Sequence, residues 1–325
     1  EQFICIHKIS IDTISTVKTC QSMGNINKLE KIKRPWVVAH RGYSGRYPEN
    51  TASAFEAAIG AGADMIELDV CLTKDRIPVV IHDQTLERTT DGHGLVSEFT
   101  LSELKRLDAG SWFSPEFKGE SIPTLEEVLF QIRGKISVNI EIKPESYESA
   151  GHADAIEKQI CIMVEKFGMN ESVLISSFEH SFFPRIKLWN KKYKDQTSLR
   201  IAPLQEKEFS EENVLKLCKV TEAYSFHPDE RFLTPSLIKI LKASSFRTIA
   251  YTINDEKRIE QLAKWGVTGI ITDEPELMRK VVRKLKSNEC LFRVSAFDIN
   301  QLMSDQNISF TKFCFTLPDG FPKKT

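Results

Sequence analysis

The sequence predicts an α/β protein built on a parallel sheet, and two observations support this fold class. Short apolar runs rich in β-branched residues alternate with segments of helical period from about residue 36 to residue 286. Such alternation is typical of parallel strands joined by helical crossovers. The chain has 325 residues, 41% hydrophobic and 27% charged, as in ordinary globular proteins. Eight strand–helix units would close a (β/α)8 barrel, whereas fewer would leave an open doubly wound sheet.

Nine apolar runs are predicted to be strands. In chain order they are Trp36–His40, Met65–Val70, Pro78–His82, Ser137–Ile142, Val173–Phe178, Leu199–Leu204, Ala223–Phe226, Arg247–Ile253 and Gly269–Thr272. Helices are predicted at Ala52–Ala61, Thr124–Ile132, Ala153–Phe167, Glu211–Cys218, Pro235–Lys242 and Glu256–Trp265. Nine strands are one too many for a barrel, and the link between Val70 and Pro78 is too short for a helical crossover. The pattern alone leaves both the barrel and the open sheet possible.

Three segments do not follow the strand–helix alternation. Residues 1–34 and 287–325 show no clear period, so we expect both to be peripheral to a catalytic unit at 35–286. Residues 84–122 interrupt the unit after its third strand, with turn signals at Asp91-Gly92 and Gly110. This insertion is predicted to be a small subdomain that forms a lid or a wall of the substrate site.

Bulk composition argues against several classes of protein. The formal net charge of -1 lacks the basic surplus of a nucleic-acid binder. No apolar run approaches the roughly 18 residues that a transmembrane helix needs. The first residues do not resemble a signal peptide, and the seven scattered cysteines fit reduced thiols, so we expect a cytoplasmic protein. Composition does not indicate the oligomeric state.

Two short motifs place charged residues on one face of a strand. Residues two apart on a strand share a face, so Glu67 and Asp69 point the same way, as do Glu141 and Lys143. Neighbouring carboxylates in an apolar strand repel each other unless a cation neutralises them, and Mg²⁺ or Ca²⁺ suits oxygen ligands. Ion-paired ends of edge strands are the structural alternative.

Two histidines lie at corresponding ends of predicted strands, His40 before Arg41-Gly42 and His82 before Asp83. An unperturbed pKa near ~6.5 lets one act as a base and the other as an acid. Arg41 offers a planar fork of donors for a phosphate, and Gly42 is expected to let the backbone approach a ligand. Together with the carboxylates, this set favours phosphoryl transfer over zinc hydrolysis, because the chain has no closely spaced histidine pair.

The order of these motifs resembles the glycerophosphodiester phosphodiesterase family from about Val37 to Leu285. The matching segments are His40-Arg41-Gly42, Pro48-Glu49-Asn50-Thr51, Glu67-Leu68-Asp69-Val70, Pro78–Asp83, Glu141-Ile142-Lys143-Pro144, Ser176-Ser177-Phe178, Thr252-Ile253-Asn254 and Thr272-Asp273-Glu274-Pro275. Two segments around the insertion, Leu86–Gly92 and Ile122–Glu127, are similar to the family's inserted subdomain.

The resemblance implies a TIM-type (β/α)8 barrel that hydrolyses glycerophosphodiesters, such as glycerophosphocholine or glycerophosphoethanolamine, to glycerol 3-phosphate and an alcohol. One of the nine runs is then an accessory strand, for which we select Ala223–Phe226. The implied site has His40 and His82 as acid and base, Glu67, Asp69 and Glu141 as ligands of Mg²⁺ or Ca²⁺, and Arg41 and Lys143 beside the phosphate.

Several residues near the motifs allow two interpretations. Asn50 or Thr51 is expected to cap the helix that starts near Ala52, whereas Glu49 is expected to bond the groups around the metal site. Tyr251 stands where many relatives have Trp, which keeps an aromatic wall on the alcohol side. Thr272 and Asp273 are interpreted as a strand-end turn.

Two rival functions stay open at this point. A lysophospholipase D would act on a lipid phosphodiester, with Trp112, Phe113 and Phe117 of the insertion either receiving an acyl chain or packing the insertion's own core. A non-catalytic binding barrel would lack one or more of the seven site residues, and none is missing.

Overall fold

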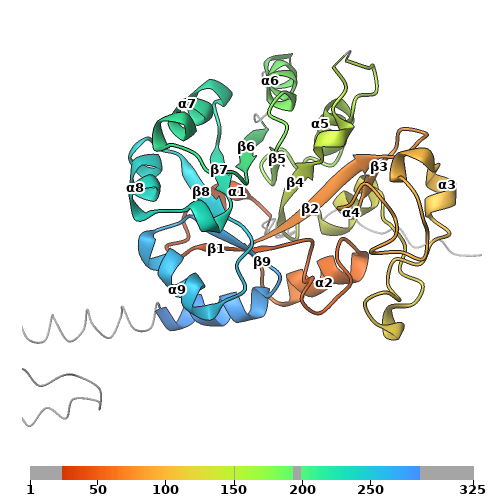
Figure 1. Ribbon diagram of the computed structural model, residues 1–325, viewed down its shortest axis with the longest axis horizontal. Coiled ribbons are helices and arrows are strands. Elements are labelled where there is room, and N and C mark those ends of the chain that lie inside the picture. The colour runs from red at the N-terminus through yellow and green to blue at the C-terminus, as the bar shows by residue number, and fades with distance from the viewer. Residues whose placement is uncertain (1–23, 150, 193–198, 286–325) are drawn as a thin grey trace, which may run out of the picture. The chain divides into compact units, whose positions relative to one another are not determined.

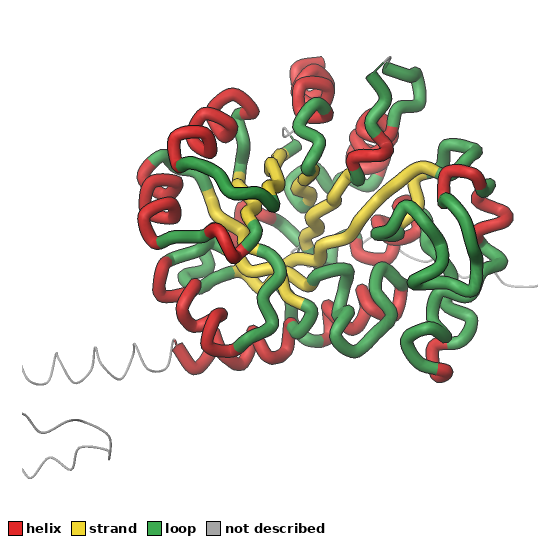
Figure 2. The backbone as a smooth tube through the Cα atoms, viewed as in Figure 1, coloured by secondary structure: helices red, strands yellow, loops and turns green. Residues whose placement is uncertain are grey.

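The computed structural model describes residues 24–149, 151–192 and 199–285. Nine strands in this part of the chain form one sheet in the order β1-β9-β8-β7-β6-β5-β4-β2-β3, and β1 also pairs with β2. The strands are β1 Trp36–Ala39, β2 Met65–Leu72, β3 Pro78–Val80, β4 Ser137–Ile142, β5 Val173–Ser177, β6 Arg200–Gln205, β7 Ser225–Pro228, β8 Arg247–Ala250 and β9 Gly269–Thr272. Because the β1–β2 pairing closes a ring of eight parallel strands, the predicted (β/α)8 barrel is confirmed (Figure 2).

Helices surround this ring (Figure 1). They are α2 Ala52–Gly60, α4 Leu125–Ile132, α5 Ile156–Lys166, α6 Phe182–Lys192, α7 Glu211–Thr221, α8 Pro235–Ala243 and α9 Glu256–Trp265, and a last helix begins at residue 275. Their first turns follow local capping chemistry: Thr124 and Glu127 form a capping box before α4, and Asp255 caps α9. Of these, α6 and the helix that begins at residue 275 were not among the predicted helices. No helix in the described ranges is both long and apolar enough to cross a bilayer.

The ninth strand is β3, and it lies outside the barrel. It pairs with β2 in the antiparallel sense, with Val70 opposite Val80 and Leu72 opposite Pro78. A hairpin needs no helical crossover, which explains the short link between these two runs. The prediction that Ala223–Phe226 is the accessory strand is wrong, because β7 pairs in parallel with both β6 and β8.

The insertion between β3 and α4 folds around a small apolar core. It contains the 3₁₀ turns Val96–Glu98 and Pro115–Phe117 and the one-turn helix α3, Leu101–Leu104. Its buried cluster consists of Cys71, Val79, Ile81, Leu86, Val96, Leu104, Ala109 and Ile122. The first three of these residues belong to the β2–β3 hairpin or directly follow it, so the core of the insertion packs on this hairpin.

The barrel interior changes from apolar to charged along its axis. Side chains from strands on different sides of the ring meet in one cluster at the floor, among them Met65, Leu174, Ala202, Ile249 and Ile271. The short helix α1, Ile26–Leu29, closes this end, and the Trp36 indole N–H donates to the Leu29 carbonyl at 2.9 Å. Buried polar residues also occur along β4, β5 and β7, namely Ser137, Asn139, Ser176, Ser225 and His227. The charged side chains sit at the opposite, C-terminal mouth.

Candidate active site

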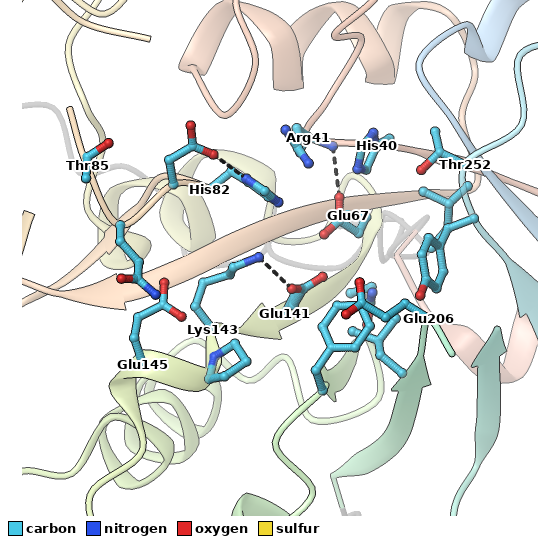
Figure 3. A pocket seen from close by; sticks show the side chains of 18 residues that line it. His40, Arg41, Glu67, His82, Thr85, Glu141, Lys143, Glu145, Glu206 and Thr252 are labelled. Atoms are coloured by element: carbon cyan, nitrogen blue, oxygen red, sulfur yellow. Dashed lines mark hydrogen bonds and ion pairs between the residues drawn. The ribbon is translucent and has the colours of Figure 1, made fainter. Parts of the chain in front are cut away.

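A cavity of about 710 Å³ opens at the C-terminal ends of the strands. Six of the seven predicted site residues line it, namely His40, Arg41, Glu67, His82, Glu141 and Lys143. The seventh, Asp69, is buried next to Glu67 and Glu141. Figure 3 shows these six side chains converging from β1, β2 and β4 and from the segment after β3. The structure therefore brings together all seven residues.

Three carboxylates form the centre of this group. Glu67, Asp69 and Glu141 each offer an oxygen within 4.8 Å of the others. Strand register explains this proximity, because Asp69 of β2 lies directly opposite Glu141 of β4. Burial and the neighbouring carboxylate charges raise the pKa of Glu67, and burial together with Asp69 raises that of Glu141 to about 7. The group could hold a metal ion, whose charge would offset this repulsion.

Two cationic side chains partly neutralise the carboxylates. The Lys143 ammonium lies 2.9 Å from Glu141 Oε1 and 3.5 Å from Asp69 Oδ1, and the Arg41 Nε lies 3.4 Å from Asp69 Oδ2. Burial alone would raise the pKa of Asp69, but the positive charges of Lys143 and Arg41 lower it to about 2. When Glu67 and Glu141 are ionised as well, the three negative charges outnumber the two positive ones. This imbalance favours the binding of a further cation.

His40 is held by a carboxylate from the other end of the catalytic unit. Its Nδ1 lies 2.6 Å from Asp273 Oδ1. The Ser44 hydroxyl donates to the same oxygen at 2.9 Å, and the Asn254 amide donates to Oδ2 at 2.6 Å. Burial would raise the pKa of Asp273, but these hydrogen bonds lower it to about 2, so the carboxylate is ionised. Asp273 therefore fixes the orientation of the His40 ring.

His82 has a matching partner that is supported differently. Its Nδ1 lies 2.6 Å from Asp83 Oδ1. Arg88 donates to both oxygens of Asp83, at 2.6 and 3.0 Å. Burial lowers the pKa of His82, and the nearby positive charges of Arg41 and Lys143 add to this effect. Each histidine thus has its own carboxylate partner at Nδ1. In the described ranges, only the partner of His82 is also paired with an arginine.

The two histidines were expected at corresponding strand ends, and this expectation is wrong. His40 follows the parallel strand β1, whereas His82 follows the antiparallel strand β3. The hairpin carries the chain past the barrel rim and back again, so that the Ile81 N–H donates to the Asp69 carbonyl at 3.1 Å. His82 reaches the mouth from outside the ring.

The loop after β1 resolves the interpretations of Glu49, Asn50 and Thr51. Thr51 caps α2, whereas the Asn50 amide donates to Asp69 Oδ2 at 3.0 Å, so a capping role for Asn50 is wrong. Glu49 accepts from Arg41 Nη1 at 2.8 Å. At Gly42 an added Cβ would lie 2.7 Å from Ala54 of α2, so the fold itself requires glycine there; the approach to a ligand stays a prediction.

The far side of the cavity is aromatic. Phe178 and Tyr251 line it with ring centroids 6.1 Å apart and planes at 89°, and Leu204 and Glu206 stand beside them. Tyr251 therefore supplies the expected aromatic wall.

The aromatic residues proposed to receive an acyl chain lie elsewhere. Trp112, Phe113 and Phe117 do not line the cavity. They form a row of ring contacts that continues to Tyr47 and Tyr43, in the loop after β1. They also lie outside the insertion's own core cluster, so they pack the insertion against the barrel. At the root of the insertion, Gln84 and Thr85 do form part of the cavity wall.

Residue chemistry alone missed several groups that support the site. Asp273 had been interpreted as part of a strand-end turn, Asn254 had been noted only as part of a matching motif, and Ser44 and Arg88 had no assigned role. Asn139 lies opposite Glu67 in the sheet, lines the cavity and is buried, and its Oδ1 has no hydrogen-bond partner. The sequence could have pointed to Asn139, because residues two apart on a strand share a face and Asn139 is two residues before Glu141.

Comparisons with known proteins agree with this geometry. The glycerophosphoryl diester phosphodiesterase family matches residues 40–277. A glycerophosphodiester phosphodiesterase of Caldanaerobacter subterraneus subsp. tengcongensis is 42% identical over 249 residues, which are 76% of this chain and 98% of that protein. One of Bacillus altitudinis is 37% identical over 254 residues, 77% of this chain and 99% of that protein.

Solved structures show the same relationship. A phosphodiesterase of Oleispira antarctica, in complex with the product sn-glycerol-3-phosphate, has a TM-score of 0.65 at 29% identity and covers 77% of this chain and 97% of its own. A glycerophosphodiester phosphodiesterase of Agrobacterium tumefaciens has a TM-score of 0.63 at 28% identity, and the match covers 75% of this chain and 98% of that protein. The match over the catalytic unit, together with these relatives, shows that the chain belongs to the glycerophosphoryl diester phosphodiesterase family of hydrolases.

Proposed function

We propose that this chain hydrolyses glycerophosphodiesters to sn-glycerol 3-phosphate and an alcohol, with glycerophosphocholine and glycerophosphoethanolamine as representative substrates. One observation carries the proposal: three carboxylates, two carboxylate-bound histidines and two cationic side chains surround a single cavity. The relatives named above are phosphodiesterases, and the product bound to the Oleispira protein is the one expected here.

The three carboxylates are the proposed ligands of a divalent cation, Mg²⁺ or Ca²⁺. Glu67, Asp69 and Glu141 present only oxygen donors, which these hard cations prefer. The elevated pKa of Glu67 and Glu141 reflects a burial and repulsion that a cation would relieve. When bound, such a cation stabilises negative charge on the phosphoryl oxygens.

The remaining charged residues have separate proposed roles. Arg41 and Lys143 bind the phosphodiester, because their positive charges lie beside the carboxylates and line the cavity. His40 and His82 move protons: one accepts a proton from the water that attacks phosphorus, and the other donates a proton to the alcohol oxygen as its bond to phosphorus breaks. With Nδ1 of each ring held by a carboxylate, Nε2 is the nitrogen that exchanges protons.

The aromatic side of the cavity is the proposed site of the alcohol group. A trimethylammonium or ammonium group is attracted to the faces of aromatic rings such as Phe178 and Tyr251. Glu206 beside them adds negative charge. Choline and ethanolamine therefore fit this wall better than an anionic alcohol.

The decisive experiment is a panel of glycerophosphodiesters assayed for release of glycerol 3-phosphate, with Mg²⁺ and Ca²⁺ supplied separately. We expect release from glycerophosphocholine or glycerophosphoethanolamine that stops in excess EDTA. Full activity in excess EDTA would remove the metal role, and no release from any member with either cation would contradict the proposed function.

The second candidate is lysophospholipase D activity on an acylated substrate. The aromatic wall could contact the first part of an acyl chain, whereas Trp112, Phe113 and Phe117 point to no acyl site because they contact Tyr47 in a packed row. Comparing rates on glycerophosphocholine and on lysophosphatidylcholine below its critical micelle concentration separates the two functions.

A further inference from the structure

Arg88 joins two parts of the site although it does not line the cavity. It lies in the insertion and donates to both oxygens of Asp83, at 2.6 and 3.0 Å, and to both oxygens of Glu49, at 2.7 and 2.8 Å. We propose that Arg88 is a positioning residue, which fixes His82 through Asp83 and Arg41 through Glu49. The inference rests on the proposed function and gives the insertion a role beyond that of a cavity wall.

The first branch of this network controls a histidine. Asp83 Oδ1 contacts both His82 Nδ1 and the Arg88 guanidinium, and Asp83 Oδ2 is taken by Arg88 alone. With both oxygens engaged, the carboxylate cannot rotate without breaking a charge-assisted hydrogen bond. Asp83 is partly exposed, so without Arg88 water would compete for the same oxygens. The orientation of the His82 ring therefore depends on Arg88.

The second branch controls a phosphate-facing arginine. The Glu49 side chain is only 11% exposed, and its Oε1 accepts from Arg41 at 2.8 Å and from Arg88 at 2.8 Å. In the described ranges the Arg41 guanidinium has one other carboxylate partner, Asp69, at 3.4 Å, while the Arg41 backbone N–H donates to Glu67 at 3.0 Å. If Glu49 moved away, Arg41 would be drawn toward Asp69 and away from the cavity. Arg88 thus keeps Arg41 apart from the carboxylate cluster.

The other histidine provides an internal comparison. Asp273, the partner of His40, is supported by Ser44 and Asn254, which follow barrel strands β1 and β8. No residue of the insertion is among its hydrogen-bond partners in the described ranges. Loss of Arg88 should therefore disturb His82 and leave His40 in place.

A purely stabilising role for Arg88 predicts a different outcome. The Arg88 side chain is 42% exposed, and exposed ion pairs contribute little to folding stability. A matched control exists in Lys105, which also ties the insertion to the barrel, through Glu127 of α4 at 2.5 Å, but has no link to the site. Lys105→Met should lose a similar amount of stability and no activity.

The test compares Arg88→Gln, Arg88→Lys and Lys105→Met with the wild-type chain on glycerophosphocholine at saturating divalent cation. For Arg88→Gln we expect kcat to fall by about 10- to 100-fold, the scale of a small misplacement of catalytic groups. KM should rise as well, because the displaced Arg41 no longer binds the phosphodiester, and the melting temperature should match that of Lys105→Met. Arg88→Lys should be intermediate, because an ammonium supplies the charge but not two forked contacts.

A second readout needs no substrate. Long-range ¹⁵N NMR of the histidine rings should show a single state of His82 with the proton on Nδ1 in the wild type and in Lys105→Met, and averaged tautomers in Arg88→Gln, with His40 unchanged. A kcat for Arg88→Gln within twofold of wild type, an equal loss in Lys105→Met, or an unaltered His82 signal would overturn the inference. If the wild type hydrolyses no substrate, the proposed function fails, and the His82 signal still decides the positioning role.

Discussion

The two walls of the cavity differ in chemistry and in the way they are built. The wall from the ends of β1 to β4 carries the carboxylates, the cationic side chains and both histidines, whereas the wall from β5 to β8 carries Phe178, Leu204 and Tyr251. The carboxylates and Lys143 of the charged wall are buried and linked by hydrogen bonds, and the aromatic wall is held by ring contacts. The contrast suggests that bond cleavage belongs to the first wall and choice of alcohol to the second.

The largest effect should follow from removing either histidine. His40→Ala and His82→Ala should each lower kcat by about 10²- to 10⁴-fold, because proton transfer in the transition state is lost. Steady-state release of glycerol 3-phosphate measures this, with exposed His93→Ala as the control. A comparable loss on substituting Phe178 would erase the distinction between the walls.

The next effect concerns the metal ligands. Glu141→Gln removes one charge from the carboxylate cluster and should weaken binding of the divalent cation by at least about tenfold. Isothermal titration with Mg²⁺ and with Ca²⁺ measures the change, and added cation should partly restore activity. Unchanged affinity for both cations would move the metal site away from these three residues.

Cation affinity should also depend on pH. The pKa of Glu141 is raised to about 7, so at about pH 6 the cation must displace a proton from Glu141 that is largely absent at about pH 8, and the raised pKa of Glu67 acts in the same direction. Affinity should therefore rise by about tenfold or more across this interval, with protons released on binding at the lower pH. Titration in buffers of different ionisation enthalpy checks both quantities, and a pH-independent affinity would contradict the expectation.

The smallest effects should come from the aromatic wall, and they should depend on substrate. Phe178→Ala should raise KM for glycerophosphocholine by about 2- to 30-fold, the range of a cation–π contact, with less effect on a neutral glycerophosphoglycerol. Tyr251→Phe keeps the ring and should change little. Phe130→Ala, at an exposed position on α4, is the control. An equal change for the charged and neutral substrates would remove the selective role of this wall.

Much of the charged wall could be predicted from local sequence, because strand parity is a local property. Glu67 with Asp69, and Glu141 with Lys143, had to share faces wherever these strands lay. The alternation of side chains along a strand could not predict which carboxylate binds which histidine. His40 and Asp273 are 233 residues apart, and only the pairing of β1 with β9 brings them together.

The errors have the same origin. Counting runs could not show that β3 reverses direction, since a short apolar run looks alike in parallel and antiparallel pairs. Ala223–Phe226 was therefore selected as the accessory strand instead of Pro78–Val80. Asn50 has the chemistry of a helix cap, and its contact with Asp69 became visible only when the loop after β1 was placed over β2.

By itself, the sequence determined the alternation of strands and helices, the faces on which the charged residues lie, and the motifs that mark the family. The tertiary structure decided the closure of β1 on β2, the hairpin that brings His82 back to the mouth, and the bridge from Arg88 to Asp83 and Glu49. The physical reason is range: periodicity and capping act over a few residues, whereas ring closure and ion-pair networks depend on contacts between distant segments.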